Sequence, residues 1–295
     1  MATSFETFKN SGSEEKSSKS VEAEANYEGN DSILLLDRLA DTVIRRQLID
    51  TLYRHKLAEH EKIMNLVLTP YELPGHPELK CFKDQDDVVY TSTDQNYDPK
   101  DRQAPSREDV EKQLNERLEE VKSMTPIDFT DRQSNQECMR PNWKLPWSEQ
   151  KPTNKQLSII EAHEKGHVIR DYDDLREYFS VGFDPTKIVF LEKDLELEAR
   201  LAKEQDENSD LSPEALRAGI VRYLFSGNEI AERMSQLKNY FGFNGSERFT
   251  KEHLDYARQH YIPDTGMDNR IGLFFQAIST DTEPAFLELI NESGI

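Results

Sequence analysis

Two histidines and a glutamate lie close together in the second half of the chain, in the segment His163-Glu164-Lys165-Gly166-His167. Residues four positions apart share one face of an α-helix, so both imidazoles can direct a nitrogen at one ion. Glu164 lies at the edge of that face, where its carboxylate can reach a water molecule bound to the ion and accept its proton. The pattern predicts a metal centre with His163 and His167 as ligands and Glu164 as general base.

The residues around this segment favour a helix that is partly buried. Apolar residues flank it on both sides, at Ile159, Ile160, Val168 and Ile169. Gly166 allows another backbone to approach closely. The alternative interpretation is an ordinary, partly buried helix with two incidental histidines.

The segment resembles the HExxH motif of the zincin metallopeptidases. The resemblance covers one helix and extends to a second if Glu229 is a further ligand. It implies a helical catalytic domain, Zn²⁺ as the metal, and a protein or peptide as the substrate of a hydrolase. Zincin helices usually keep uncharged residues around the motif, whereas this chain has Glu161 and Lys165.

A catalytic zinc usually has three protein ligands and one open position, so a third ligand is expected. In the gluzincin branch this ligand is a glutamate on a later helix, and Asn228-Glu229 resembles the start of that helix. The resemblance therefore implies Glu229 as a ligand, 62 positions after His167. The chain has Arg233 where the gluzincin pattern has an aspartate. The dipole of the helix favours an acidic residue at this position even without a metal.

Two other acidic residues are alternative third ligands. A metzincin-like extension of the motif ends at Asp173, although Arg170 stands where that pattern has glycine. A helical continuation would instead use Asp171, four residues after His167. Hydrogen-bond donors for an oxyanion are also available on a later helix, at His253, Tyr256 and His260, but an amphipathic helix explains these three equally well.

Composition excludes several classes of function. The chain has 37 basic and 57 acidic residues and a net charge of −20, so we expect neither nucleic acid nor an anionic membrane surface as a ligand. The N-terminal residues lack the apolar region of a signal peptide, and no apolar run approaches a membrane span. Cys81 and Cys138 form no CxxC pair, and reduced thiols are expected. These features predict a cytoplasmic protein.

The pattern along the chain predicts a mainly α fold with a minimal sheet. Residues 1–31 are expected to form a disordered acidic tail. Residues 32–124 are expected to form a helical N-terminal region with a proline-rich linker, in which 87–91 is a short strand. Residues 125–295 are the candidate zincin-like domain. Apolar spacing predicts helical structure over 32–68, as one helix or a hairpin, and helices over 106–124, 154–172, 213–226, 228–240 and 250–261. Residues 191–210 are expected to be mostly solvated charge.

Two functions follow from these patterns. The first is a zinc-dependent peptidase whose metal-activated water is deprotonated by Glu164. The second is a non-catalytic helical interaction or structural protein that docks to a larger assembly. An inactive zincin relative is one form of this alternative. A protein partner would then bind through the N-terminal helices. The metal site distinguishes the two functions. A closed ligand set indicates a structural metal, whereas an open coordination position indicates catalysis.

Overall fold

The computed structural model describes residues 30–101, 103–123, 144–145, 147–148, 150–170, 175–205, 211–267 and 269–295. The predicted disordered tail lies outside the described residues except at its end. Cys138, Asp171 and Asp173 also lie outside them. The predictions for these residues stay predictions.

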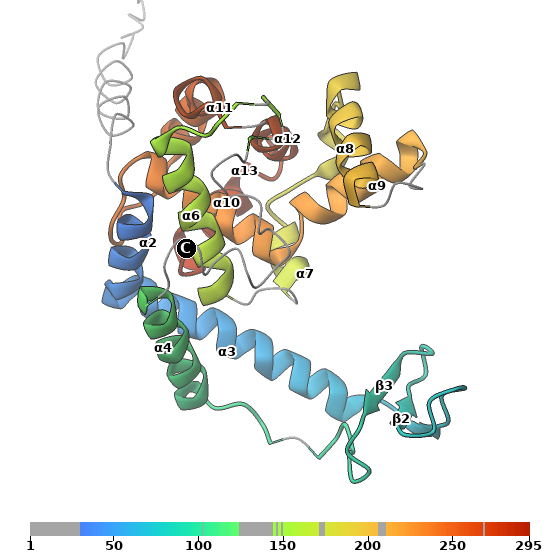
Figure 1. The fold of residues 1–295 in the computed structure, drawn as a ribbon. Helices are drawn as coiled ribbons and strands as arrows, with labels where there is room; N and C mark the ends of the chain where they lie inside the picture. Colours follow the sequence, from blue (N-terminus) through green and yellow to red (C-terminus); the bar gives the residue numbers. More distant parts are fainter. Residues whose placement is uncertain are drawn as a thin grey trace, which may run out of the picture. The chain divides into compact units, whose positions relative to one another are not determined.

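The fold is mainly helical with one small antiparallel sheet, which confirms the predicted fold class (Figure 1). The chain forms two compact units. One comprises residues 49–115, and the other comprises the described residues up to Leu48 and from Glu116 onward. The contacts thus group the start of the first long helical segment with the second half of the chain, whereas the sequence patterns placed it with residues 32–124.

Residues 32–68 form two helices, α2 (Asp31–Ala40) and α3 (Thr42–Asn65). Asp41 separates them because its backbone is extended. Its carboxylate accepts hydrogen bonds from the backbone N–H groups of Val43 and Ile44, at 2.8 and 3.1 Å. An aspartate that caps a helix in this way starts a new helix at the following residue.

The unit of residues 49–115 contains the sheet. Strands β1 (Thr69–Tyr71), β2 (Lys80–Lys83) and β3 (Val89–Ser92) are antiparallel, in the order β1-β2-β3. The strand predicted at 87–91 is β3. The other two were missed because they are very short and β1 contains Pro70. Helix α4 (Arg107–Ser123) begins in this unit and agrees with the helix predicted over 106–124.

The larger unit is a helical assembly. Its further elements, in chain order, are α6 (Asn154–Ile169), α7 (Arg176–Ser180), the 3₁₀ turn η2 (Pro185–Lys187), α8 (Glu192–Gln205), α9 (Pro213–Leu224), α10 (Gly227–Tyr240), α11 (Lys251–Thr265), α12 (Asn269–Ala277) and α13 (Glu283–Glu292). The helices predicted over 154–172, 213–226, 228–240 and 250–261 therefore exist. The charged residues of 192–205, expected to be solvated, form α8.

Helix α10 lies at the centre of this unit. Every residue from Glu229 to Tyr240 is buried, and helices α2, α6, α7, α9 and α13 contact α10 (Figure 1). Ile230, Met234 and Leu237 supply its apolar contacts. The same helix also buries several charged and amide side chains. Because a buried polar group without a partner is costly, these side chains constrain what packs around α10.

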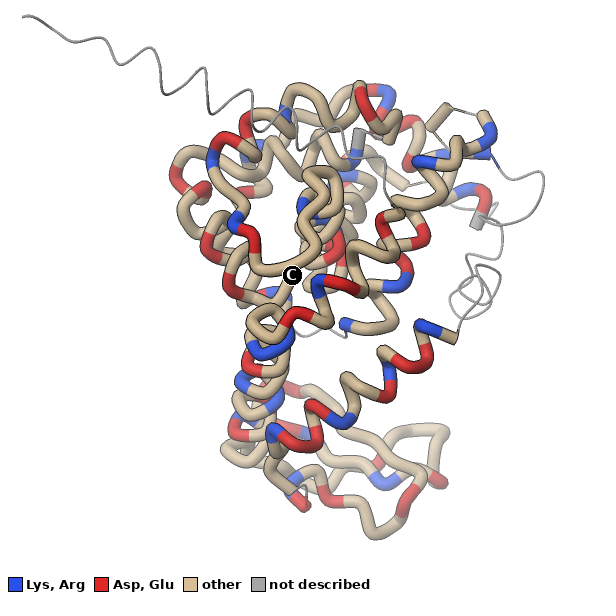
Figure 2. Tube along the Cα trace, turned by 90° about the vertical axis from the view of Figure 1, so that its left-hand side faces the viewer, with Lys and Arg blue, Asp and Glu red and all other residues tan. Residues whose placement is uncertain are grey.

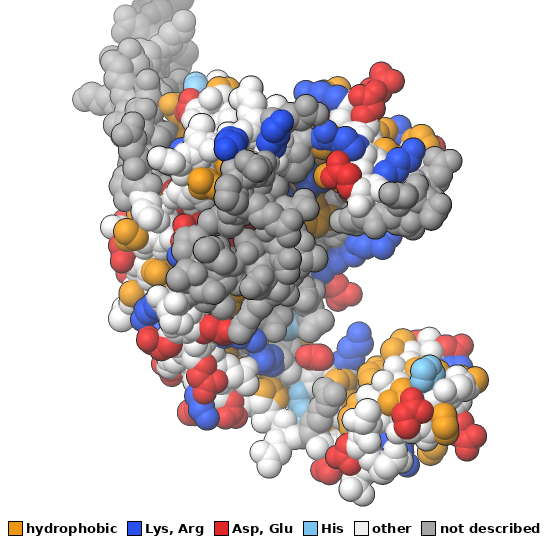
Figure 3. Space-filling model, in the orientation of Figure 1, with side chains coloured by type: hydrophobic (Ala, Val, Ile, Leu, Met, Phe, Trp, Pro, Cys, Tyr) orange, Lys and Arg blue, Asp and Glu red, His pale blue; other side chains and the backbone are white. Residues whose placement is uncertain are grey.

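Basic and acidic residues are intermixed in the views of Figures 2 and 3. Figure 2 shows Lys and Arg interspersed with Asp and Glu along the described helices. The face in Figure 3 likewise carries side chains of both signs. None of the described helices combines the length and the hydrophobicity needed to cross a lipid bilayer.

Candidate metal centre

The HEKGH segment lies on α6, whose ends are well defined. Thr153 and Gln156 form a capping box at its N-terminus, in which each side chain bonds the backbone N–H of the other residue. The helix ends at Arg170, whose backbone is extended. His163 and His167 therefore lie one turn apart near the C-terminal end of the helix, as the sequence predicted.

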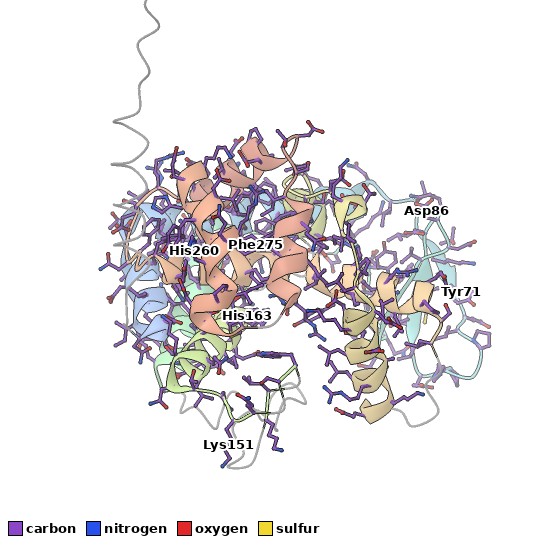
Figure 4. The ribbon with its side chains drawn as sticks, turned by 90° about the horizontal axis from the view of Figure 1, so that it is seen from above. Tyr71, Asp86, Lys151, His163, His260 and Phe275 are labelled. Carbon is purple, nitrogen blue, oxygen red and sulfur yellow. The ribbon has the colours of Figure 1, made fainter. Side chains whose placement is uncertain are left out.

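The third predicted ligand lies against both histidines. Glu229 is in the first turn of α10, where Ser226 caps the helix and accepts a hydrogen bond from the Glu229 backbone N–H. Helices α6 and α10 pack against each other (Figure 1). Figure 4 labels His163 among the helices of this unit. The structure thus brings together the residues predicted at 163, 167 and 229.

The three donor atoms have the spacing of a tetrahedral zinc site. The two Nε2 atoms are 3.0 Å apart, and Oε1 of Glu229 lies 3.6 Å from Nε2 of His163 and 3.4 Å from Nε2 of His167. A tetrahedral zinc with bonds of about 2.0–2.1 Å separates its ligand atoms by roughly 3.3–3.4 Å. The three distances lie within about 0.3 Å of this separation, so the residues present fit a zinc ion.

The cluster contains three donors among the described residues. Zinc sites with three protein ligands keep a fourth position for water or substrate, whereas structural sites are filled by four. A donor set of two imidazoles and one carboxylate also favours zinc over magnesium or calcium, which prefer oxygen ligands. The described residues thus supply three of the four positions of a tetrahedral site.

The carboxylate of Glu229 is held by a second partner. Its Oε2 atom accepts a hydrogen bond of 3.2 Å from the guanidinium of Arg233, one turn further along α10. Oε1 faces the histidines, so the two oxygens have separate roles. Arg233 stands at the position where the gluzincin pattern has an aspartate, and here it orients the ligand directly. Such partners fix a ligand's orientation and tune its affinity for the metal.

The charges around the site shift two pKa values. Burial alone would raise the pKa of Glu229, but His163, His167 and Arg233 hold it well below its ordinary value. Burial alone would lower the pKa of His167. The hydrogen bond to Glu229 and the charges of Glu232, Glu229 and Glu164 outweigh burial and raise the pKa of His167 to about 8. A cation, either a proton or a metal ion, is therefore stabilised among these atoms.

Glu164, predicted as the general base, follows His163 on α6. Its negative charge acts on His167, and its side chain is half-buried. In the described part of the chain no ion pair or hydrogen bond holds its carboxylate. The neighbouring Lys165 is instead paired with Glu161, Nζ to Oε1 at 2.5 Å. Glu164 is therefore available to accept a proton.

A buried ion pair joins Arg170, at the C-terminal end of α6, to Glu232 of α10. One Nη1 atom of Arg170 lies 2.8 Å from both carboxylate oxygens of Glu232, and both side chains are fully buried. The Glu232 carboxylate also fills the space beside Gly166, where a Cβ atom would collide with it. The close neighbour of Gly166 is thus a side chain of α10 and not the backbone that the sequence analysis expected.

Sequence reasoning missed one aromatic residue at this site. Tyr223 of α9 is 43% exposed, yet its hydroxyl interacts with the Glu229 carboxylate, and burial of the hydroxyl together with this negative charge raises the pKa of Tyr223. The phenol therefore stays protonated and can donate a hydrogen bond. Its position depends on how α9 packs, so local sequence could not indicate it. The Glu229–Arg233 pair was foreseeable from its four-residue spacing.

The later helix that was considered for oxyanion donors has other roles. His253 belongs to the capping box of α11 with Thr250, and its ring packs against Phe241 and Phe243. The ring of His260 stacks on Tyr256, and its Nδ1 atom bonds the Tyr256 carbonyl. These interactions explain both histidines as structural. Cys81 is buried on β2, within the other unit.

Comparison of the chain with protein-family models, with curated proteins and with solved structures found no match. The site therefore has to be interpreted from its own geometry.

Proposed function

We propose that this protein is a zinc-dependent hydrolase that cleaves peptide bonds. The observation that carries the proposal is the convergence of His163, His167 and Glu229 at the mutual distances of zinc ligands. The Glu164 carboxylate beside them has no structural partner among the described residues. A purely structural role would leave that arrangement unexplained.

Each residue has a defined part in the proposed reaction. Bound zinc would lower the pKa of its water toward about 7 and polarise the carbonyl of the substrate. Glu164 accepts the proton of the attacking water at its carboxylate and delivers it to the leaving nitrogen. Arg233 keeps one oxygen of Glu229 turned away from the histidines. Tyr223 supplies a neutral O–H donor at the edge of the site.

The non-catalytic alternative is tested by the same site. A structural metal needs a filled coordination sphere, and the described residues supply three donors.

The described part of the larger unit contains no β-strand, so it offers no sheet edge to bind an extended peptide. The proposed peptidase must therefore hold its substrate with helices and side chains.

Metal content and turnover should be measured on the same purified full-length proteins. We expect equimolar zinc in the wild type and in His260→Ala, which alters a histidine outside the site. His163→Ala should lose the zinc, and Glu164→Gln should keep it but lose cleavage of a mixed peptide pool. Equal zinc in the wild type and His163→Ala would refute the metal centre. Zinc without any turnover in the wild type would favour the non-catalytic alternative.

The third ligand is tested by three matched removals of one negative charge. Glu229→Gln should weaken zinc binding strongly, whereas Asp171→Asn and Asp173→Asn should leave zinc affinity close to that of the wild type. Competition with a chromogenic chelator measures all four proteins on one scale. A loss of affinity in either aspartate variant, with Glu229→Gln unaffected, would move the third ligand to the end of α6.

A further inference from the structure

A pocket of about 520 Å³ opens beside the metal centre, between helices α8, α9, α11 and α12. Its apolar lining consists of Trp147, Leu197, Ile220, Ile262, Met267 and Leu273. Ile220 and Leu273 are almost fully buried, at 3% and 2% exposure, so they form a fixed floor. The volume lies within the range of about 300–1,000 Å³ that is typical of ligand pockets.

The charged groups of the pocket cancel one another. Three acidic and three basic residues line it, and the guanidinium of Arg270 lies 2.9 Å from the Glu198 carboxylate. Lys193 and Glu196, of opposite sign, are both exposed. The formal charges of the lining sum to zero, so the pocket as a whole does not select a ligand of one sign. The lining instead favours an uncharged, apolar group.

Tyr223 connects this pocket to the metal ligands. Its hydroxyl interacts with Glu229, while the guanidinium of Arg270 lies over its ring, 5.2 Å from the ring centroid. Arg270 in turn lines the pocket, and so does Ile220, which lies one helical turn before Tyr223. The pocket therefore begins one aromatic ring away from the centre. At about 3.3–3.6 Å per extended residue, a few residues of peptide span that separation.

We infer that this pocket binds a large apolar side chain of the substrate, aliphatic or aromatic, a few residues from the bond that is cleaved. The inference rests on the proposed peptidase function and adds its substrate class: peptides or proteins with an apolar residue at one fixed distance from the scissile bond. Because the described part of this unit offers no sheet edge, a side-chain pocket supplies the register that strand pairing would otherwise provide.

Binding can be tested without turnover, because Trp147 lines the pocket and its fluorescence responds to what binds there. The chain has two tryptophans, so Trp143→Phe leaves Trp147 as the sole one. Blocked hexapeptides that differ only in one residue (Phe, Leu, Gly, Asp or Lys) should be titrated against this protein while its emission is recorded. The titration is done on metal-free protein and on zinc-loaded protein that also carries Glu164→Gln.

We expect the Phe and Leu peptides to shift the Trp147 emission and to bind about tenfold or more tightly than the Gly peptide. Met267→Asp places a charge in the half-buried lining and should abolish this preference. Val189→Asp adds the same charge at an exposed position of the same unit and should not. The inference would be overturned if the apolar peptides left the emission unchanged. It would also be overturned if the Asp and Lys peptides gave the same response as the Phe and Leu peptides.

The outcome is separable from that of the peptidase proposal. A selective Trp147 response in metal-free protein that never cleaves peptides would retain the pocket and refute the peptidase. Cleavage of the peptide pool without preference for an apolar residue, together with a silent Trp147, would refute the pocket alone.

Discussion

The carboxylate of Glu232 occupies the space beside Gly166 into which a methyl group would have to fit. Arg170 holds that carboxylate in place through two contacts of 2.8 Å, so it cannot move aside freely. Gly166, the residue before the second histidine of the HEKGH segment, thus sets how closely α6 approaches α10. Because the histidines are on one helix and Glu229 is on the other, this approach determines whether the three donors meet.

Gly166→Ala should therefore destabilise the protein despite the higher helix propensity of alanine. We expect a loss of about 1–3 kcal/mol in the free energy of unfolding, as is usual for overpacking, and a weaker zinc affinity. Gly219→Ala is the matched control, since it lies on a helix with nothing within 4 Å of the added methyl group, and it should stabilise by about 0.4–1 kcal/mol. Urea unfolding measures both. Similar effects at the two positions would contradict the close contact.

Arg233→Met should lower zinc affinity by about 10–100-fold, the usual effect of losing a partner that orients a metal ligand. The cause is the release of Oε2 of Glu229, which Arg233 now holds at 3.2 Å. Arg233→Lys keeps the positive charge one turn from Glu229 and should recover part of the affinity. If Arg233→Met binds zinc as tightly as the wild type, the arginine has no part in orienting Glu229.

Tyr223→Phe should leave zinc content unchanged and lower kcat by about 10²–10³-fold, because the variant lacks the neutral O–H donor at the site. The phenol ring and its contact with Arg270 are retained, so KM should change little. Tyr178→Phe, which removes a hydroxyl bonded to Ser293, serves as the control in the same unit and should keep full activity. A Tyr223→Phe enzyme with wild-type kcat would exclude this donor from the reaction.

The pKa of His167 in the metal-free protein gives a prediction about pH. It is raised to about 8 from its ordinary value of 6.5, so protonated His167 stabilises the fold fully below pH 6.5. This stabilisation, about 2 kcal/mol, is lost as the pH rises through 8. The stability difference between metal-free wild type and His167→Gln should therefore shrink over this range.

The comparison with His167→Gln removes an opposing contribution. Burial and the charges of Arg38 and Arg170 lower the pKa of Lys238 to about 7. Its buried charge therefore destabilises the fold below pH 7, and this destabilisation is relieved as the pH rises from 7 toward 10.5. Both proteins contain Lys238, and its effect cancels in the difference. A stability difference that is constant from pH 6 to pH 9 would contradict the raised pKa of His167.

The sequence predicted the helix that carries His163, Glu164 and His167 because spacing along one helix is a local property. It also indicated Glu229, but only through the resemblance to a known pattern. The interactions that hold the site, Arg170 with Glu232 and Tyr223 with Glu229, join residues on different helices. No local periodicity encodes such pairs. Strands β1 and β2 were missed for a related reason, because each is too short to show alternation and is defined by its neighbour.

The most direct test of the account is X-ray absorption at the zinc edge of the purified full-length protein. The account predicts one zinc site with two imidazole nitrogens and two oxygens, one from Glu229 and one exchangeable, at about 2.0–2.1 Å. Glu229→Gln should alter this spectrum and His260→Ala should not. Sulfur ligands at about 2.3 Å, or a wild-type protein that binds no more zinc than His163→Ala, would contradict the proposed centre.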